Sequence, residues 1–217
     1  MAAKLGLVLT PEQPATPSQR ARQERIVAAA VELAGEGGYD AVQMREVAER
    51  SGVALGTLYR YFPSKKHLLV AAMGQELARM RDAVMVQGRG AEAARERLLR
   101  VISGVTEALG RNRRLSAAMV YAFMGADESV SSDVDRVGTI MIEIISWATH
   151  GAETPPTAND AHIAGIIGKV WLFDIAALVA DRMTINDVKQ DLAMTIATVI
   201  PDGVGLIAQA PRTAREA

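Results

Sequence analysis

The chain has 217 residues, of which 49% are hydrophobic, so it can bury a sizeable core and is not of the disordered class. Its formal net charge is only -1, which excludes a uniformly basic nucleic-acid binder and requires any such affinity to come from a local patch. The sequence contains no cysteine, which excludes disulfides and thiolate metal sites. We find no signal-like segment and no transmembrane-length run without charges, and we therefore expect a cytoplasmic protein.

The hydrophobic pattern is helical almost throughout, and no sustained alternation predicts a strand. Residues 1–17 are interrupted by three prolines and are predicted to form a flexible arm. Ser18 is expected to cap a first helix that runs to about Glu36, where two glycines stop it.

The next stretch, residues 42–69, predicts two short helices joined by a tight turn and followed by a third helix. Gly52 supplies the turn, while Pro63 ends one helix and Ser64 caps the next. The second short helix carries small, hydroxyl, aromatic and basic side chains. Because this arrangement is typical of a helix-turn-helix, residues 18–63 are predicted to form a three-helix DNA-binding head.

Residues 64–200 are predicted to form a helical body for effector binding and dimerisation, and residues 201–217 a flexible tail. Glycine and proline pairs separate the expected helices of the body. Capping boxes are predicted for three of them, at Ser132 with Asp135, Thr157 with Asp160, and Thr184 with Asp187. The expected fold class is all-α, with about nine helices in total.

Four motifs lie in or beside the head: Gly37-Gly38-Tyr39, Val47-Ala48, Gly52-Val53 and the ten-residue block from Gly56 to Lys65. With these motifs, the region from about residue 20 to 75 resembles the TetR family of one-component bacterial regulators. GGYDAVQMREVA with GTLYRYFPSKKHLL looks most like the actinobacterial repressors of sterol catabolism within that family. Gln43 departs from the family's usual Thr or Ser helix cap, and Arg113 departs from a proline common before the sixth helix.

The candidate DNA contacts lie in the segment 43–67, where five cations face two anions and give a net charge of +3. Gly56 would let the backbone approach DNA closely, and Arg60 is long enough to reach a base edge or a phosphate. The alternative is a solvated helix face above an aromatic core. The full set of candidates is Arg45, Ala54, Gly56, Thr57, Tyr59, Arg60, Tyr61 and Lys65.

The resemblance implies a pocket for a bulky apolar effector in the body, and methionines and aromatics are the adaptable side chains that suit one. Ordinary core packing explains the same residues equally well. Asp174 stands on an apolar stripe, so its carboxylate is expected to meet a ligand hydroxyl, a cation of a partner subunit, or solvent. The candidate lining residues are Met119, Tyr121, Phe123, Met124, Met141, Trp147, Trp171, Phe173 and Asp174.

The last two predicted helices are apolar over broad faces and carry more apolar surface than one core needs, which indicates a dimer interface. Its candidate residues are Ile163, Ile167, Val170, Leu178, Val188, Leu192, Ile196 and Val199.

We therefore expect a homodimeric, ligand-released repressor that reads a near-palindromic operator and possibly controls lipid or steroid catabolism. No cofactor is expected. The effector would be a steroid or an acyl-CoA thioester, with Arg111, Arg113 and Arg114 available for an anionic tail. The alternatives are an activator, or a helical small-molecule binding protein without a DNA function. No nucleophile, nucleotide or metal motif is found, so an enzyme is not expected.

Overall fold

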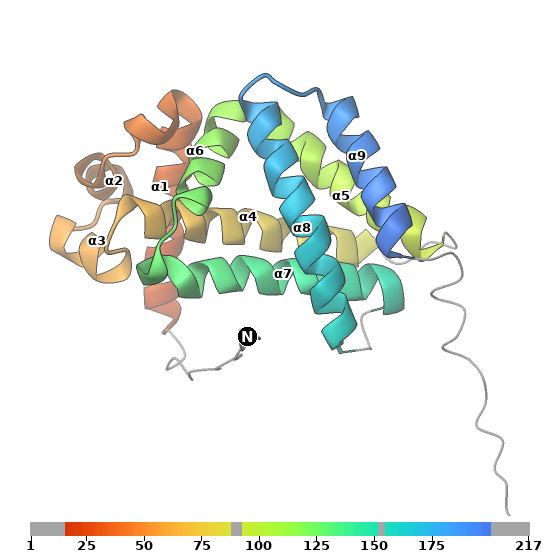
Figure 1. Cartoon of the computed structure of the whole chain (residues 1–217). Helices are drawn as coiled ribbons and strands as arrows, with labels where there is room; N and C mark the ends of the chain where they lie inside the picture. The colour runs from red at the N-terminus through yellow and green to blue at the C-terminus, as the bar shows by residue number, and fades with distance from the viewer. Residues whose placement is uncertain (1–15, 88–92, 152–154, 201–217) are drawn as a thin grey trace, which may run out of the picture.

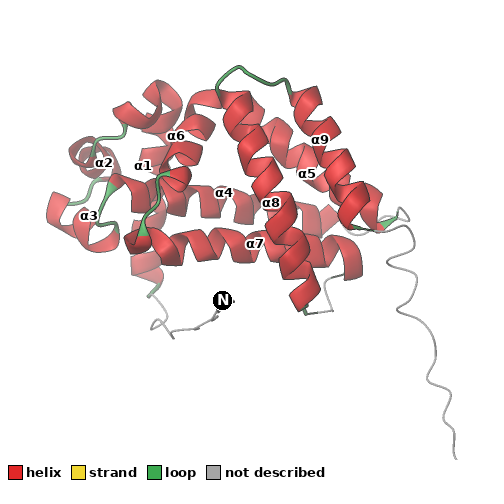
Figure 2. Cartoon of the chain, viewed as in Figure 1, coloured by secondary structure: helices red, strands yellow, loops and turns green. Residues whose placement is uncertain are grey.

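The computed structural model describes residues 16–87, 93–151 and 155–200, and all regular structure within these ranges is helical (Figures 1 and 2). This confirms the all-α prediction. The predicted arm and tail lie almost entirely outside the described residues. The helices are α1 Pro17–Ala41, α2 Met44–Ser51, α3 Leu55–Tyr61, α4 Lys65–Gln87, α5 Ala94–Arg111, α6 Arg113–Met124, a 3₁₀ turn η1 at Glu128–Val130, α7 Ser131–His150, α8 Ala158–Val179 and α9 Ile185–Val199.

Helix α1 begins earlier than predicted and is capped by Thr16 instead of Ser18. The Thr16 hydroxyl accepts a bond from the Gln19 backbone N–H (3.2 Å), and the Gln19 side chain accepts one from the Thr16 N–H (2.7 Å). Pro17 occupies the first helical position, where its fixed φ fits and its missing N–H costs nothing. The helix also continues beyond Glu36, interrupted by Gly38 at φ 71°.

The head consists of α1, α2 and α3, and α1 is also its main contact with the body. Helix α1 packs on α2 at one side and on α6 and α4 at the other. In Figure 1 the short helices α2 and α3 lie at one end of the molecule, with the body helices extending away from them. Gly35 marks the close approach to α6, because a Cβ there would lie 2.9 Å from the Asn112 side-chain nitrogen.

Helices α4 and α7 run side by side and in the same direction (Figure 1). Their contacts keep a nearly constant offset along the sequence, as expected for a parallel pair. The contacts are Lys66 with Asp127, Gly74 with Val137, and Arg81 with Glu143. The first turn of α4, next to the head, is therefore fixed to the start of α7.

Two of the three predicted capping boxes are confirmed, those at Thr157 with Asp160 and Thr184 with Asp187. The prediction for Ser132 was wrong, because the chain enters α7 through the 3₁₀ turn η1. Asp127 caps that turn, and Ser132 already lies inside the helix.

Among the described residues, α8 is long and apolar enough to cross a membrane by length and composition, with a mean hydropathy of 1.7 over its best window. The helix carries Asp160, Lys169 and Asp174, so it is not a run without charges. In the fold it packs against α6, α7 and α9, and the side chains of one stripe are buried there.

Candidate functional sites

The helix-turn-helix is built on a glycine turn and two buried anchors. Gly52 adopts φ 68°, the left-handed conformation that favours glycine, and ends α2. Across the turn, the Val53 N–H donates to the Ala48 carbonyl at 3.0 Å. Leu58 and Phe62 are buried and orient α3 on the head. The opposite side of α3 is thereby turned outward.

The outward side of α3 and its flanks carries six of the eight predicted DNA-contact residues. Four of them are exposed, and Thr57 and Tyr61 are half-buried. The Arg60 guanidinium lies over the Tyr61 ring, 5.8 Å from its centroid. Arg45 is exposed on the first turn of α2, whose N-terminus has no side-chain cap. These placements suit contact with DNA, and the contacts themselves remain predictions.

Gly56 has no structural requirement inside the protein. A Cβ added there would meet nothing within 4 Å, and its φ is not in the left-handed region. A glycine within a helix costs about 1 kcal/mol relative to alanine. A backbone left bare on the outward face is what a close approach to DNA needs.

Lys65 points back to the head in this structure. Its ammonium donates to the Tyr39 carbonyl at 3.0 Å and lies 4.0 Å from the centroid of the Tyr39 ring. The predicted phosphate contact of Lys65 therefore requires its side chain to change rotamer, or the phosphate to be reached beside Tyr39.

The first turn of α4 lines a cleft of about 680 Å³ between the head and the start of α7. His67 bridges it: Nε2 is 2.9 Å from the Ser129 carbonyl, and Nδ1 is 2.8 Å from the Ser64 hydroxyl. Because a carbonyl only accepts, Nε2 carries a hydrogen. Lys66 pairs with Asp127 at 3.1 Å.

This connection was not foreseen from the sequence, where nothing relates the first turn of α4 to residues some 60 positions later. Hydrogen bonds from Ser129 and Lys66 lower the pKa of Asp127 to about 2. The Asp127 carboxylate is therefore charged at neutral pH, and its ion pair with Lys66 persists there.

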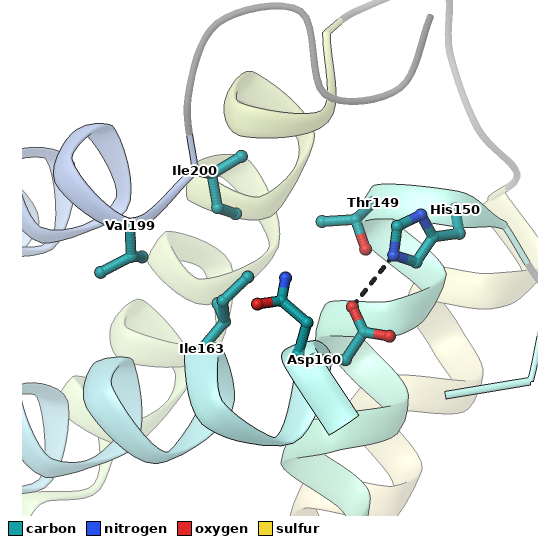
Figure 3. A pocket seen from close by; sticks show the side chains of 7 residues that line it. Thr149, His150, Asp160, Ile163, Val199 and Ile200 are labelled. Carbon is teal, nitrogen blue, oxygen red and sulfur yellow. Dashed lines mark hydrogen bonds and ion pairs between the residues drawn. The ribbon is translucent and has the colours of Figure 1, made fainter. Parts of the chain in front are cut away.

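The predicted effector pocket does not coincide with either cavity that we describe. Neither of the two cavities that we describe is lined by any of the nine predicted residues. The body cavity, at the end of α7, holds only about 40 Å³ (Figure 3), whereas pockets for drug-sized ligands span roughly 300–1,000 Å³. Its polar wall is His150, whose Nε2 lies 3.0 Å from an Asp160 carboxylate oxygen.

The nine residues divide between core and surface, and Asp174 is among the buried ones. Met119, Met141, Trp147 and Trp171 are packed in the core, whereas Tyr121, Met124 and Phe173 are exposed and Phe123 is half-buried. The Trp171 indole donates to the buried Thr106 hydroxyl at 2.9 Å, so its polar edge is satisfied within the protein.

Most of the predicted dimer residues are buried within the protomer. Five of them are fully buried inside the protomer, Ile163 is nearly so, and only Val170 and Val199 are half-buried. The fully buried five, which pack the protomer core and cannot meet a partner, are Ile167, Leu178, Val188, Leu192 and Ile196.

A different stripe of the same two helices faces outward. Phe173 is 67% exposed, Met194 66% and Ile166 46%, and a lysine and an aspartate lie beside them. We name this surface the α8–α9 outer face, and its residues are Gly165, Ile166, Lys169, Phe173, Asp191 and Met194. Exposed aromatic and aliphatic side chains on adjacent helices are typical of an interface.

Two of the three arginines proposed for an anionic tail are already engaged. Arg113 pairs with Asp181 at the end of α8, and the Arg114 guanidinium donates to the Glu36 carbonyl of α1 at 2.8 Å. These arginines connect α6 to its neighbours, and neither of the two described cavities borders them.

The fold and the head thus define a helix-turn-helix DNA-binding protein with a helical body. Comparisons with known proteins agree. Residues 26–72 match the profile of "Bacterial regulatory proteins, tetR family", and residues 91–199 match "Tetracyclin repressor-like, C-terminal domain". The chain belongs to the TetR family of transcriptional regulators.

Curated relatives match over most of their length. The HTH-type transcriptional repressor KstR of Rhodococcus jostii is 41% identical over 186 residues, which cover 86% of each chain. The protein of that name from Mycobacterium tuberculosis is 40% identical over 196 residues, covering 90% of this chain and 88% of its own.

Solved structures share the fold. A TetR transcriptional regulator from Rhodococcus sp. RHA1 superposes with a TM-score of 0.77 at 34% identity, covering 85% of this chain and 98% of its own. Thermus thermophilus FadR, solved in complex with lauroyl-CoA, gives a TM-score of 0.65 at 21% identity, covering 89% of this chain and all of its own.

Proposed function

We propose that this regulator is a homodimeric repressor that binds a near-palindromic operator and is released by a lipid-like effector, a steroid or an acyl-CoA thioester. The observation that carries the DNA function is the outward side of α3, where an unneeded glycine lies among hydroxyl, aromatic and cationic side chains over the buried Leu58. Two such heads would enter major grooves about 34–36 Å apart. Repressor activity is supported by the curated relatives, which carry that name.

The domain division follows the same reasoning. We propose residues 16–63 as the DNA-binding head, beginning at the Thr16 cap, and residues 64–200 as the effector and dimerisation body. The matched family profiles also divide the chain into an N-terminal and a C-terminal part, although the first profile extends to residue 72, beyond the proposed boundary, and the second begins at residue 91.

Binding of a second copy through the α8–α9 outer face is supported by the exposed Phe173 and Met194, and by the opposite charges of Lys169 and Asp191. Sedimentation of the Phe173→Glu variant tests this face. We expect a monomer, whereas the control Met124→Glu, exposed at the end of α6, should remain dimeric.

The effector proposal rests on the relatives and on the body's composition. The one cavity described within the body, at the end of α7, holds only about 40 Å³. A bulky effector in the body would therefore bind by displacing core side chains such as Met119 and Met141. Saturation binding with a sterol-derived and a long-chain acyl-CoA thioester tests this class, and release of bound DNA by either is the expected result.

The DNA function is tested by selecting bound duplexes from a random library and titrating the best one with salt. The logarithm of the association constant should fall steeply with the logarithm of salt concentration. Arg60→Ala should weaken binding, while Arg182→Ala, an exposed arginine of the turn before α9, should not. A reporter with the selected site across its promoter then distinguishes repression from activation.

A further inference from the structure

Asp174 has a buried carboxyl that lacks a hydrogen-bond partner for one of its oxygens within the described protomer. The residue is 5% exposed, and its Oδ2 has no hydrogen-bond partner among the described residues. Its neighbours on the same stripe of α8, Trp171 and Leu178, are also buried. An unpaired carboxylate in such a place is costly, because nothing replaces the water that it loses.

The charge that faces Asp174 makes this cost larger. Across the contact between α8 and α9 the nearby charged group is Asp191, which is also an acid. Burial, followed by the Asp191 carboxylate, raises the pKa of Asp174 to about 6, and no charged group of α5, α6 or α7 contributes to the shift. Lys169 of the same helix points away, about 140° around the axis at 100° per residue.

Asp174 lies at the edge of the α8–α9 outer face, since Phe173 precedes it and Asp191 belongs to that face. The following inference therefore rests on the proposed dimer. A second copy seated on this face removes the remaining water from the contact between the two helices, and it leaves both carboxyls less solvated than in the protomer.

We propose that each Asp174 carboxyl takes up a proton when two protomers associate through the α8–α9 outer face, so that dimer formation is coupled to pH. The proton removes the repulsion from Asp191 and the cost of burying an unpaired charge. Near the pKa of Asp174, the dimer then holds more protons than two separate protomers, and the extra protons are on the two Asp174 carboxyls.

The sign of the coupling follows from the direction of the shift. A carboxyl that holds its proton more tightly in the dimer favours association at low pH. This advantage is lost as the pH rises through the pKa that the carboxyl has in the dimer. Asp174→Asn keeps the shape and removes the charge. The variant should therefore associate at high pH as tightly as the wild type does at low pH.

The test measures subunit exchange between two fluorescently labelled populations of the full chain at pH 8 and pH 6. Wild-type exchange should slow by about fourfold at pH 6, because a rise of about half a unit in the pKa of Asp174 on each of two protomers gives a tenfold limit only well below both pKa values. Asp174→Asn should exchange slowly at both values. The matched control Asp135→Asn, an exposed acid on α7, should behave as the wild type.

Histidines titrate in this pH range, and His162 lies on the exposed side of α8, so the variant decides and not the pH profile alone. Faster exchange of Asp174→Asn at pH 8 would mean that a cation of the partner holds the carboxylate, and would overturn the proposal. Unchanged exchange would overturn it as well. If Phe173→Glu leaves the dimer intact, the α8–α9 outer face is not the interface. The Asp174 variant tests only the coupling to protons, so the two failures can be told apart.

Discussion

The rings of Tyr39 and Tyr121 meet edge to face, with centroids 4.5 Å apart, where the end of α1 contacts α6. The Lys65 ammonium donates a hydrogen bond to the Tyr39 carbonyl and also lies over the face of the Tyr39 ring. Burial, followed by the neighbouring Tyr121, raises the pKa of Tyr39. One aromatic side chain thus joins the head, the first turn of α4 and the body.

Replacing Tyr121 by alanine should loosen this junction. Aromatic pairs contribute about 0.5–1.5 kcal/mol beyond the area they bury, so we expect urea unfolding to show a loss of about 1 kcal/mol. Tyr121→Phe keeps the ring and should match the wild type. Equal destabilisation by both variants would show that the hydroxyl matters and not the ring contact.

Gly56→Leu should separate DNA binding from stability. A helical glycine costs about 1 kcal/mol and a new Cβ meets no atom, so the unfolding free energy should stay the same or rise. Operator affinity should fall at least about tenfold, roughly 1.4 kcal/mol, because the side chain holds α3 off the groove.

The control for this variant is Gly104→Leu. Gly104 is an exposed glycine of α5 with no atom near its absent Cβ, so the substitution changes helix propensity in the same way and should leave DNA binding intact. A similar loss of affinity in both variants would remove Gly56 from the DNA interface.

The start of α8 should show a defined pH dependence through Asp160. This buried carboxylate accepts bonds from the Thr157 N–H and hydroxyl, both at 2.7 Å, and it faces His150. Burial raises the pKa of Asp160, but these bonds and the coulombic effect of His150 outweigh it, so the pKa is lowered. The resulting stabilisation is present above the unfolded pKa, about 3.9, and is lost as pH falls through the folded one.

Asp160→Asn should therefore reduce the unfolding free energy at pH 7 by about 0.5–2 kcal/mol, the range for a capping side chain. Urea unfolding at pH 7, 5 and 3 should show the wild type and the variant converging at the lowest pH. A constant difference would assign the effect to side-chain shape instead of charge.

Local sequence signals predicted the head and most helix ends correctly, because the chemistry that sets them is local. The turn at Gly52 depends only on the positive φ of that glycine, and the capping box at Thr157 depends only on the residue three positions later, Asp160. The same rule failed at Ser132, since Asp127 had already started a turn upstream. It also failed at Ser18, where Pro17 and Gln19 suited Thr16 as the cap.

The inward and outward sides of α8 and α9 could not be assigned from the sequence. Apolar residues surround both helices, so periodicity finds two stripes and does not say which one the protomer buries. Ile167 belongs to the buried stripe and Phe173 to the exposed one, although both are large and apolar. The pocket residues present the same difficulty, because methionines fill a closed core as readily as they line a cavity.

The parallel pair α4 and α7 should respond to the loss of His67. His67→Ala removes the bond to the Ser129 carbonyl, so the stability loss should be about 1 kcal/mol, the usual net contribution of a hydrogen bond. Hydrogen exchange should rise in the first turns of α4 and in η1, while the Arg81–Glu143 end stays protected.

The matched control is His162→Ala. His162 is exposed on α8, and its ring lies 2.8 Å from the Ala158 carbonyl of its own helix, so its loss should leave exchange at the start of α4 unchanged. If exchange in α4 does not change in His67→Ala either, the bond from His67 is not needed to hold the first turn of α4 on η1, and the Lys66–Asp127 ion pair is sufficient there. Protection lost along the whole of α4 would mean that the pair behaves as one cooperative unit, fixed at its head end.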